Sequence, residues 1–300
     1  MLGNLYMSFT LYIFILQSYL ADIMKILYVT DLHGAEWKYE KIIEAAKTTN
    51  VDIVLNGGDM LLLGGNLLNQ DRFIIEYLDE YFSRFNSEKI YFITMLGNDD
   101  LQKFDEFFQK TCDKYEYIIN IANSIFEINN YEFIGFNLVP DLPFALKDRA
   151  RMDTKEFEFP KQFGKPVIST SNGWKKINEW FSYVATIPTI EEEINDLVRP
   201  SNMEKAIYII HTPPSDISLD VCHDGKKVGS KAVYEFLKKY QPLISFHGHI
   251  HESAEVSGKW YNKIGRTLCI QPGQSHYHEK YLVYALIDLE TMELERKVII

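Results

Sequence analysis

Cysteine is scarce in this chain. Only Cys112, Cys222 and Cys269 occur among 300 residues, and no two of them form a C-x-x-C pair. That pattern excludes a disulfide framework and a thiolate zinc cluster as the basis of the fold. We expect a protein of a reducing compartment, and therefore a cytoplasmic one.

Positive charge is also scarce, because 31 Lys and Arg face 42 Asp and Glu, for a formal net charge of −11. A protein that holds long nucleic acid through its phosphates needs a basic face. We therefore expect no long nucleic-acid partner, which argues against a processive nuclease. A small phosphorylated substrate stays open, including a nucleotide, because metal ions can neutralise its charge locally.

No Lys or Arg precedes the apolar run at residues 5–23, so the basic segment of a signal peptide is missing. The run is near the lower length limit for a membrane span and contains polar interruptions. Met24 begins "MKILYVTDLHG", which has the pattern of a first strand. We interpret residues 1–23 as an apolar extension outside the fold, either a start site assigned too early or an anchor or signal. A membrane is a partner only in the second case.

The composition, with 46% hydrophobic and 24% charged residues, is typical of a globular protein with a sizeable core. Short apolar runs at 25–29, 52–56 and 89–96 alternate with helical patterns at 36–49 and 71–85. This β-α-β-α-β order predicts parallel strands with helices packed on the sheet.

The second half of the chain resumes the pattern, with strands expected at 206–210 and 243–247 and a helix at 230–240. Between about 140 and 200, six prolines interrupt a weakly periodic segment. That segment is too poor in periodic apolar residues to form a second core, so we interpret it as an insertion or lid. Residues 24–300 are then one domain.

Polar side chains follow five of the expected strands, at the point where each strand ends. They are Asp31, His33, Asp59, Asn98, His211, His249 and His251. The carboxyl ends of strands converge on one crevice in α/β sheets, so these side chains are expected to lie together. Oxygen and imidazole donors without thiolate, seven in number, suit two divalent ions that share a bridging carboxylate.

Each motif is weak by itself, since Gly, Asn and Asp are also the residues that turns prefer. As an ordered set, D-x-H, G-D, G-N, H and G-H-x-H resembles the calcineurin-like metallophosphoesterase superfamily, over residues 25 to about 290. The stretches "VPDLPFALKDRARMD" and "FHGHIHES" are similar to a microbial branch of predicted phosphoesterases. The resemblance implies an α/β fold: a four-layer αββα sandwich of two mixed sheets flanked by helices, with a dinuclear metal site at the C-terminal strand ends.

The resemblance also implies a role for each motif residue. Asp31, His33 and His251 would bind the first ion, Asn98, His211 and His249 the second, and Asp59 would bridge them. A hydroxide held between the ions would attack phosphorus in line. The donor set is compatible with Mn, Fe, Zn, Ni or Co, and we favour Mn.

The sequence departs from the family pattern at Asp99, where many members have a histidine that assists the leaving group. An ordinary aspartate is ionised at neutral pH and cannot act as an acid. Asp99, with His211, is our candidate catalytic residue, and two hypotheses stay open for it. Either its pKa is raised beside Asp100, or it is an acceptor that orients a His ligand.

Three cations of the insertion, Lys147, Arg149 and Arg151, are candidate contacts for the substrate phosphate, although a solvated charge run is the commoner explanation. Gln271-Pro272-Gly273 is interpreted as a turn near the metals. The alternative function is a metal-binding interaction module with weak or no catalysis. All seven ligand positions are filled, which favours the hydrolase.

Overall fold

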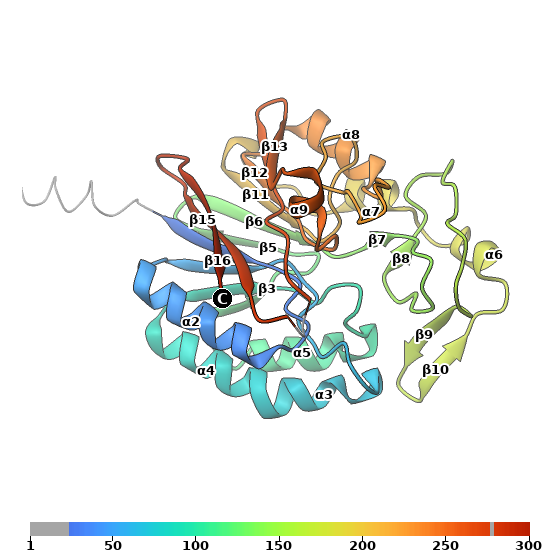
Figure 1. The fold of residues 1–300 in the computed structure, drawn as a ribbon, viewed down its shortest axis with the longest axis horizontal. Helices are drawn as coiled ribbons and strands as arrows, with labels where there is room; N and C mark the ends of the chain where they lie inside the picture. The colour runs from blue at the N-terminus through green and yellow to red at the C-terminus, as the bar shows by residue number, and fades with distance from the viewer. Residues whose placement is uncertain (1–23, 277–278) are drawn as a thin grey trace, which may run out of the picture.

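The computed structural model describes residues 24–276 and 279–300. The interpretation of residues 1–23 as an extension, anchor or signal therefore falls outside the described residues. Two six-stranded sheets face each other, and helices cover their outer faces (Figure 1). Within the described part of the chain, no helix is long and apolar enough to cross a bilayer.

The first sheet has the strand order β16-β15-β1-β2-β3-β4. Its strands are β1 (Lys25–Val29), β2 (Ile53–Asn56), β3 (Tyr91–Thr94), β4 (Ile118–Asn120), β15 (Leu282–Asp288) and β16 (Leu294–Ile299). The strands β1 to β4 are parallel, whereas β15 runs antiparallel to β1 and β16 antiparallel to β15. The sheet is therefore mixed, as expected.

The second sheet has the strand order β13-β14-β12-β11-β6-β5. Its strands are β5 (Ile125–Ile128), β6 (Tyr131–Phe136), β11 (Ala206–Ile210), β12 (Ile244–Phe246), β13 (Tyr261–Ile264) and β14 (Thr267–Ile270). The inner four are parallel, and β5 and β13 are antiparallel edges. Asn129 and Asn130 join β5 to β6 with positive φ angles, the conformation that a two-residue hairpin turn requires.

Strand side chains alternate between two apolar layers. In β1, Leu27 and Val29 pack against the outer helices, while Ile26 and Tyr28 face the second sheet and meet Ile207 there. A third layer lies between the second sheet and its own helices. Every face of both sheets is covered, so the central strands are continuous apolar runs. The expectation of a four-layer α/β sandwich is confirmed.

Helices α2 (Glu36–Thr49), α4 (Asp79–Glu88) and α5 (Asp105–Cys112) cover the first sheet (Figure 1). The helix expected at 71–85 is built from α3 (Gln70–Phe73), a π-helical turn (Ile74–Leu78) and α4. Helices α7 (Ile190–Asp196) and α8 (Lys231–Tyr240) cover the second sheet, and α9 (Ser253–Ser257) follows the last histidine motif.

Residues 141–188, called the insertion below, stand to one side of the sandwich (Figure 1). Beside the short pair β7 (Val139–Pro140) and β8 (Ala150–Arg151), the segment forms the hairpin β9 (Val167–Thr170) and β10 (Gly173–Lys176) and the helix α6 (Trp180–Val184). Its small apolar cluster centres on Ala150, Ile177, Trp180 and Val184.

Candidate metal centre

Seven polar side chains gather where strands of both sheets end. Asp31 and His33 follow β1, Asp59 follows β2, Asn98 follows β3, His211 follows β11, and His249 and His251 follow β12. Parallel strands end at the same edge of a sheet, and the two facing sheets bring both sets of ends together. The first sheet contributes the carboxylates and the amide, and the second contributes three of the four imidazoles.

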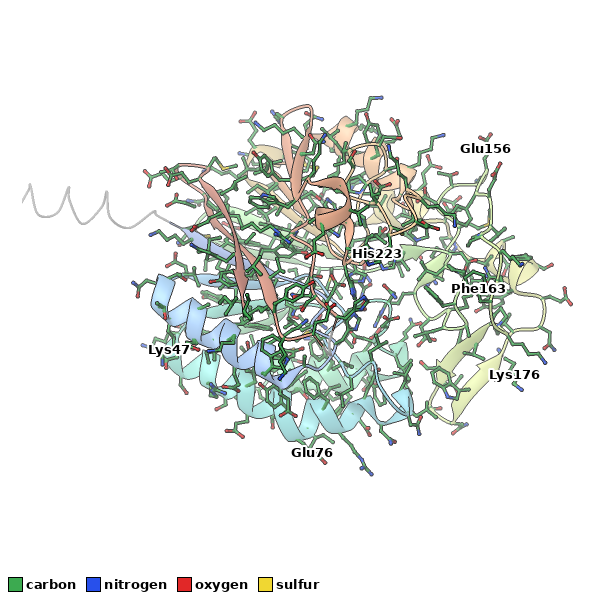
Figure 2. All side chains as sticks on the ribbon, viewed as in Figure 1. Lys47, Glu76, Glu156, Phe163, Lys176 and His223 are labelled. Carbon is green, nitrogen blue, oxygen red and sulfur yellow. The ribbon has the colours of Figure 1, made fainter. Side chains whose placement is uncertain are left out.

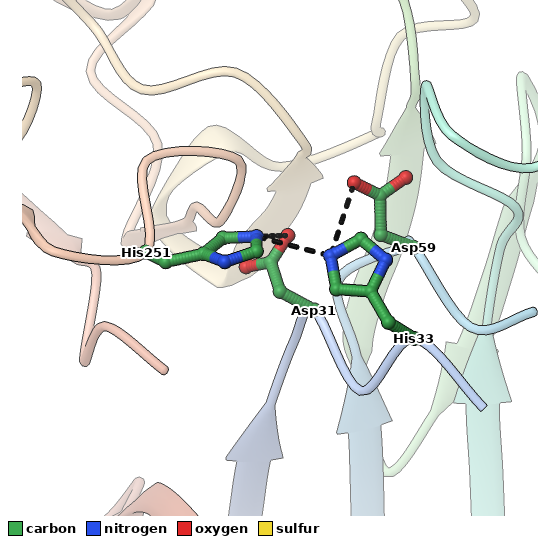
Figure 3. A group of neighbouring side chains, drawn as sticks. All are labelled: Asp31, His33, Asp59 and His251. Carbon is green, nitrogen blue, oxygen red and sulfur yellow. Dashed lines mark hydrogen bonds and ion pairs between the residues drawn. The ribbon is translucent and has the colours of Figure 1, made fainter. Parts of the chain in front are cut away.

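One ligand group consists of Asp31, His33, Asp59 and His251, whose donor atoms all lie within 4.8 Å of one another (Figure 3). The Nε2 atoms of His33 and His251 are 3.1 Å apart. Two imidazole nitrogens at that distance need a proton or a cation between them, because two lone pairs would repel. The donor set and this contact fit a divalent ion.

The other group forms around His211. Its Nδ1 lies 2.8 Å from the Gly57 carbonyl oxygen, so Nδ1 carries the proton and Nε2 is free to ligate. The Nε2 atom is 2.9 Å from Asn98 Oδ1 and 3.3 Å from Asp59 Oδ2. The ring of His249 lies 5.3 Å from that of His211. Asp59 therefore faces both groups.

Burial and neighbouring charges shift the pKa values of the side chains in this site. Burial alone would lower the pKa of His211, but the Asp59 carboxylate raises it to about 9. Burial and the charge of His211 lower the pKa of His249 to about 3. Burial opposes ionisation of Asp59, yet His211 and His33 hold its pKa below its usual range. A bound cation would favour the neutral form of the His33, His211 and His249 imidazoles while the Asp31 and Asp59 carboxylates stay charged.

The backbone is strained at the ligands themselves. Asp31, His33, Asp59 and His249 all have left-handed φ angles, of 57°, 46°, 53° and 70°. A positive φ is uncommon in residues other than glycine and concentrates at functional sites. Here the sharp turn after each strand points the side chain back across the strand ends.

Two motif glycines are required by close approach. A Cβ atom on Gly97 would lie 2.2 Å from Asp59 Oδ1, and one on Gly248 would lie 2.1 Å from Thr30 Oγ1. Both distances are far below van der Waals contact, so only glycine allows the ligand loops to meet. The G-N and G-H-x-H patterns thus have a steric cause in this fold.

Asp100, considered in the sequence only as a neighbour of Asp99, has a supporting role that the sequence did not predict. Its fully buried carboxylate accepts hydrogen bonds from the backbone N–H groups of Met60 at 2.9 Å, Leu61 at 2.7 Å and Gly97 at 2.7 Å. It thereby ties the loop after Asp59 to the loop that carries Asn98. The only signal in the sequence was a second carboxylate directly after a buried strand.

A second supporting element is the segment Gln271-Pro272-Gly273, which the sequence indicated as a turn near the metals without indicating its contacts. Gln271 Nε2 donates to the carbonyl oxygens of Gly248 and Ile250, the neighbours of the ligand His249. These hydrogen bonds fix the backbone of the G-H-x-H loop from the segment Gln271-Pro272-Gly273. Nearby, the buried ammonium of Lys38 donates to the carbonyl oxygen of Ser275 at 2.7 Å, and burial lowers its pKa to about 8.

Asp99 lies beside the ligands without joining a group. Its Oδ1 accepts a hydrogen bond of 2.9 Å from Asn98 Nδ2, and its N–H donates to Asp59 Oδ1 at 2.8 Å. The first contact turns the amide oxygen of Asn98 toward His211. Burial and the Asp59 charge, with a smaller contribution from Asp100, raise the pKa of Asp99 to about 8. The ligand that Asp99 contacts as an acceptor is Asn98 and not the histidine expected from the sequence, and both an acid role and an orienting role stay open.

The three cations of the insertion are engaged with protein groups. Lys147 is buried and paired with Asp141 at 2.7 Å. Arg149 donates from Nε to the Gly97 carbonyl oxygen at 2.8 Å and also pairs with Asp105. Arg151 Nη1 donates to backbone carbonyls. This arrangement lends no support to substrate contact by Lys147 and Arg149, and it makes Arg149 a tether between the insertion and the Asn98 loop.

Comparison with known families gives a match to the calcineurin-like phosphoesterases over residues 24–253. No curated protein sequence matches this chain. One solved structure is similar with a TM-score of 0.58 at 19% identity, covering 92% of this chain and 98% of its own. Protein TT1561 of Thermus thermophilus is similar with a TM-score of 0.54 at 15% identity and the same coverage.

A third solved structure, GAP50, described as the anchor in the inner membrane complex of Plasmodium, has a TM-score of 0.50 at 12% identity. The alignment covers 92% of this chain and 84% of GAP50. At such identities these likenesses show a shared fold and nothing finer.

Proposed function

The chain belongs to the calcineurin-like phosphoesterase family, hydrolases of phosphoester bonds, and from that premise we propose that it hydrolyses a small phosphomonoester or phosphodiester with two divalent ions. The observation that carries the proposal is the position of Asp59, within 3.9 Å of His33 Nε2 on one side and 3.3 Å of His211 Nε2 on the other. One carboxylate facing two imidazole groups is what a bridged pair of ions requires.

The proposed ligand assignment follows the two groups. One ion would be held by Asp31, His33 and His251, the other by Asn98, His211 and His249, and Asp59 would contribute to both. Oxygen and neutral imidazole donors suit Mn, Fe, Zn, Ni or Co, with Mn favoured. The 3.1 Å contact between two imidazole nitrogens is compatible with the fit, because either a shared proton or a cation removes their repulsion.

Two divalent ions held by these residues would supply an activated water and charge neutralisation for phosphoryl transfer. The residues of the chain itself bind the ions and orient the side chains that hold them. Asp99 fixes the amide of Asn98 and could hold a proton on its carboxyl for the leaving group. Asp100 holds the loop after Asp59 against the loop that carries Asn98.

The expected substrate is small. The chain carries a formal net charge of −11, which repels a long polyanion, whereas one phosphate group can be neutralised by the ions themselves. A nucleotide fits this description as well as any other small phosphate ester.

The test uses the full chain after removal of metal with a chelator. Turnover of bis-p-nitrophenyl phosphate and of p-nitrophenyl phosphate is measured with and without added Mn²⁺, together with bound metal. We expect Mn²⁺-dependent turnover whose ratio between the two substrates assigns diester or monoester preference. In the variant Asp59→Asn, turnover should fall at least ~10³-fold, because charge stabilisation in a phosphoryl-transfer site is the largest single contribution.

The matched control is Asp113→Asn, an identical change at an exposed residue next to α5, which should keep full turnover. Absence of turnover with two ions still bound would overturn the hydrolase assignment in favour of a metal-binding interaction module. Failure to bind any divalent ion would overturn the metal site itself.

A further inference from the structure

The insertion contains a stretch whose charge is opposite to that of the chain as a whole. Residues 159–178, called the basic strip below, hold four lysines and no Asp or Glu. Acidic residues number 42 in 300, about one in seven, so a stretch of this length without one is unusual for this chain. The strip contains no arginine either.

The hairpin register gathers these lysines. Lys176 is opposite Val167 and Lys175 is opposite Ile168. Lys165 lies two residues before Val167, and the Ile177 N–H donates to the Pro166 carbonyl at 2.9 Å. Lys165, Lys175 and Lys176 therefore lie near the open end of one hairpin, with Lys175 and Lys176 on opposite faces of it. Lys161 lies four residues upstream of Lys165.

The four lysines are exposed, and across residues 24–276 and 279–300 none of them makes an ion pair. Their charge is therefore available to a partner outside the chain. Figure 2 shows Lys176 directed outward from the insertion, on the side away from the sandwich.

Exposed aromatic side chains stand among these lysines. Phe163 is 72% exposed, and its ring meets that of Phe144, itself 61% exposed, at 6.5 Å between centroids. The Phe163 N–H donates to the Pro143 carbonyl at 2.8 Å, which fixes the two segments side by side. Trp174, 41% exposed, lies next to Lys175 in β10. Outside the insertion, the described residues hold one further exposed Phe or Trp, Phe107 at 36%.

We propose that the basic strip, with Phe144, docks the protein on an anionic lipid surface. Lysines beside exposed Phe and Trp are the side chains that bind the membrane interface: the ammonium groups attract anionic headgroups, and the rings enter the headgroup boundary. Within the strip, β9 lies against the sandwich, where the Lys103 N–H donates to Ser169 Oγ at 3.1 Å, whereas Lys175 and Lys176 belong to the more exposed strand β10. This surface is separate from the metal centre, so the inference does not depend on the proposed reaction.

Nucleic acid also binds lysine and aromatic residues, but it fits these observations less well. Nucleic-acid sites use arginine for bidentate contacts with phosphate and a groove that follows the backbone. The strip has lysine only, and its charges stand on a two-stranded hairpin.

The test measures binding of the full chain to vesicles of phosphatidylcholine with or without phosphatidylglycerol, by co-sedimentation at low and high salt. The anionic vesicles should be bound at least about tenfold more tightly, and high salt should remove the difference. The apolar run at residues 5–23 carries no Lys or Arg, so any binding it adds does not respond to lipid negative charge in this way.

The lysine variant combines Lys161→Ser, Lys165→Ser, Lys175→Ser and Lys176→Ser, and it should lose the preference for anionic vesicles. Its control makes the same change at four exposed lysines elsewhere, Lys227, Lys239, Lys259 and Lys263, and should keep it. Phe163→Ser should weaken vesicle binding, whereas Phe107→Ser should not. Turnover of a soluble substrate should be unchanged in all variants, which shows that they fold.

A local readout comes from Trp174, the most exposed tryptophan. Brominated lipids should quench its fluorescence, and Trp174→Phe should lose that quenching. Equal loss of vesicle binding in the lysine variant and its control would overturn the proposal. Binding of a labelled single-stranded RNA by the strip, without binding to anionic vesicles, would assign the surface to nucleic acid and also overturn it.

Discussion

Asp100 shows how a residue outside the ligand set can determine the ligand geometry. A single carboxylate accepts three backbone N–H groups from two loops, and each loop carries one proposed ligand. In Asp100→Asn, one acceptor oxygen is replaced by an amide that faces N–H donors. Burial and the Asp59 charge raise the pKa of Asp100 to about 7, so the comparison is made above that pH, where the group is ionised. We expect the free energy of unfolding to fall by about 3 kcal/mol there, because charged acceptors contribute about 1.5–3 kcal/mol per hydrogen bond.

Urea denaturation of the metal-free protein measures this loss, and Mn²⁺ titration should show weaker binding in the same variant. The exposed control Asp113→Asn should change stability by less than about 0.5 kcal/mol. Unchanged stability in Asp100→Asn would mean that the two loops hold their positions without the carboxylate.

The two hypotheses for Asp99 make different predictions for Asp99→Asn. If the carboxyl gives a proton to the leaving group, the loss of turnover should be larger for phenyl phosphate than for p-nitrophenyl phosphate, because nitrophenolate leaves without a proton. If Asp99 only orients the amide of Asn98, both substrates should lose turnover equally and Mn²⁺ binding should weaken. Measuring kcat for both substrates in both proteins separates the two roles.

The strands and the polar motifs that follow them were predictable from the sequence, because each is marked by residues that are close together in the chain. The apolar runs and the polar residues after them located β1, β2, β3, β11 and β12 and all seven candidate ligands, because the strand period and the strand-end motifs lie within a few residues. Asp100, Gln271 and Lys38 were not assigned their supporting roles, since their partners are backbone groups up to 238 residues away. No local pattern identifies such contacts.

The insertion illustrates the same limit at the scale of an element. The sequence indicated its position, but its basic residues suggested a solvated or substrate-binding run. In the fold, both side chains instead make contacts that fix the insertion. Lys147 pairs with Asp141 inside the insertion, and Arg149 donates a hydrogen bond to the carbonyl oxygen of Gly97 in the sandwich. Buried cations with protein partners cannot be distinguished from exposed ones by composition alone.

Arg149→Gln should therefore loosen the insertion. The variant loses the pair with Asp105 and the hydrogen bond to Gly97, so opening of the insertion should cost less free energy. Limited digestion with chymotrypsin, which cleaves after exposed aromatic residues such as Phe144 and Phe163, should be several-fold faster within residues 141–188. Lys155→Gln, which breaks an exposed pair with Glu192, is the control and should be digested at the rate of the unaltered protein.

At the scale of the whole molecule, the proposed ions would join two sheets that already meet through apolar packing and through hydrogen bonds such as that of His211 Nδ1 to the Gly57 carbonyl oxygen. Asp31, His33, Asp59 and Asn98 come from the first sheet, whereas His211, His249 and His251 come from the second. Only the folded chain brings these side chains together, so binding of metal ions adds to the free energy of unfolding. The left-handed backbone at four of the ligands is strain that the bound ions would offset.

Mn²⁺ should accordingly raise the thermal stability of the metal-free protein. At a free concentration of about 100 times Kd, one site adds about 2.7 kcal/mol, which corresponds to a rise in Tm of roughly 5 °C for a chain of this size. Calorimetry with and without Mn²⁺ measures the rise. Asp59→Asn should lose most of it, because this residue faces both ligand groups, and Asp113→Asn should retain it. An equal rise in all three proteins would show that Mn²⁺ binds elsewhere and that the two sheets are not joined through this site.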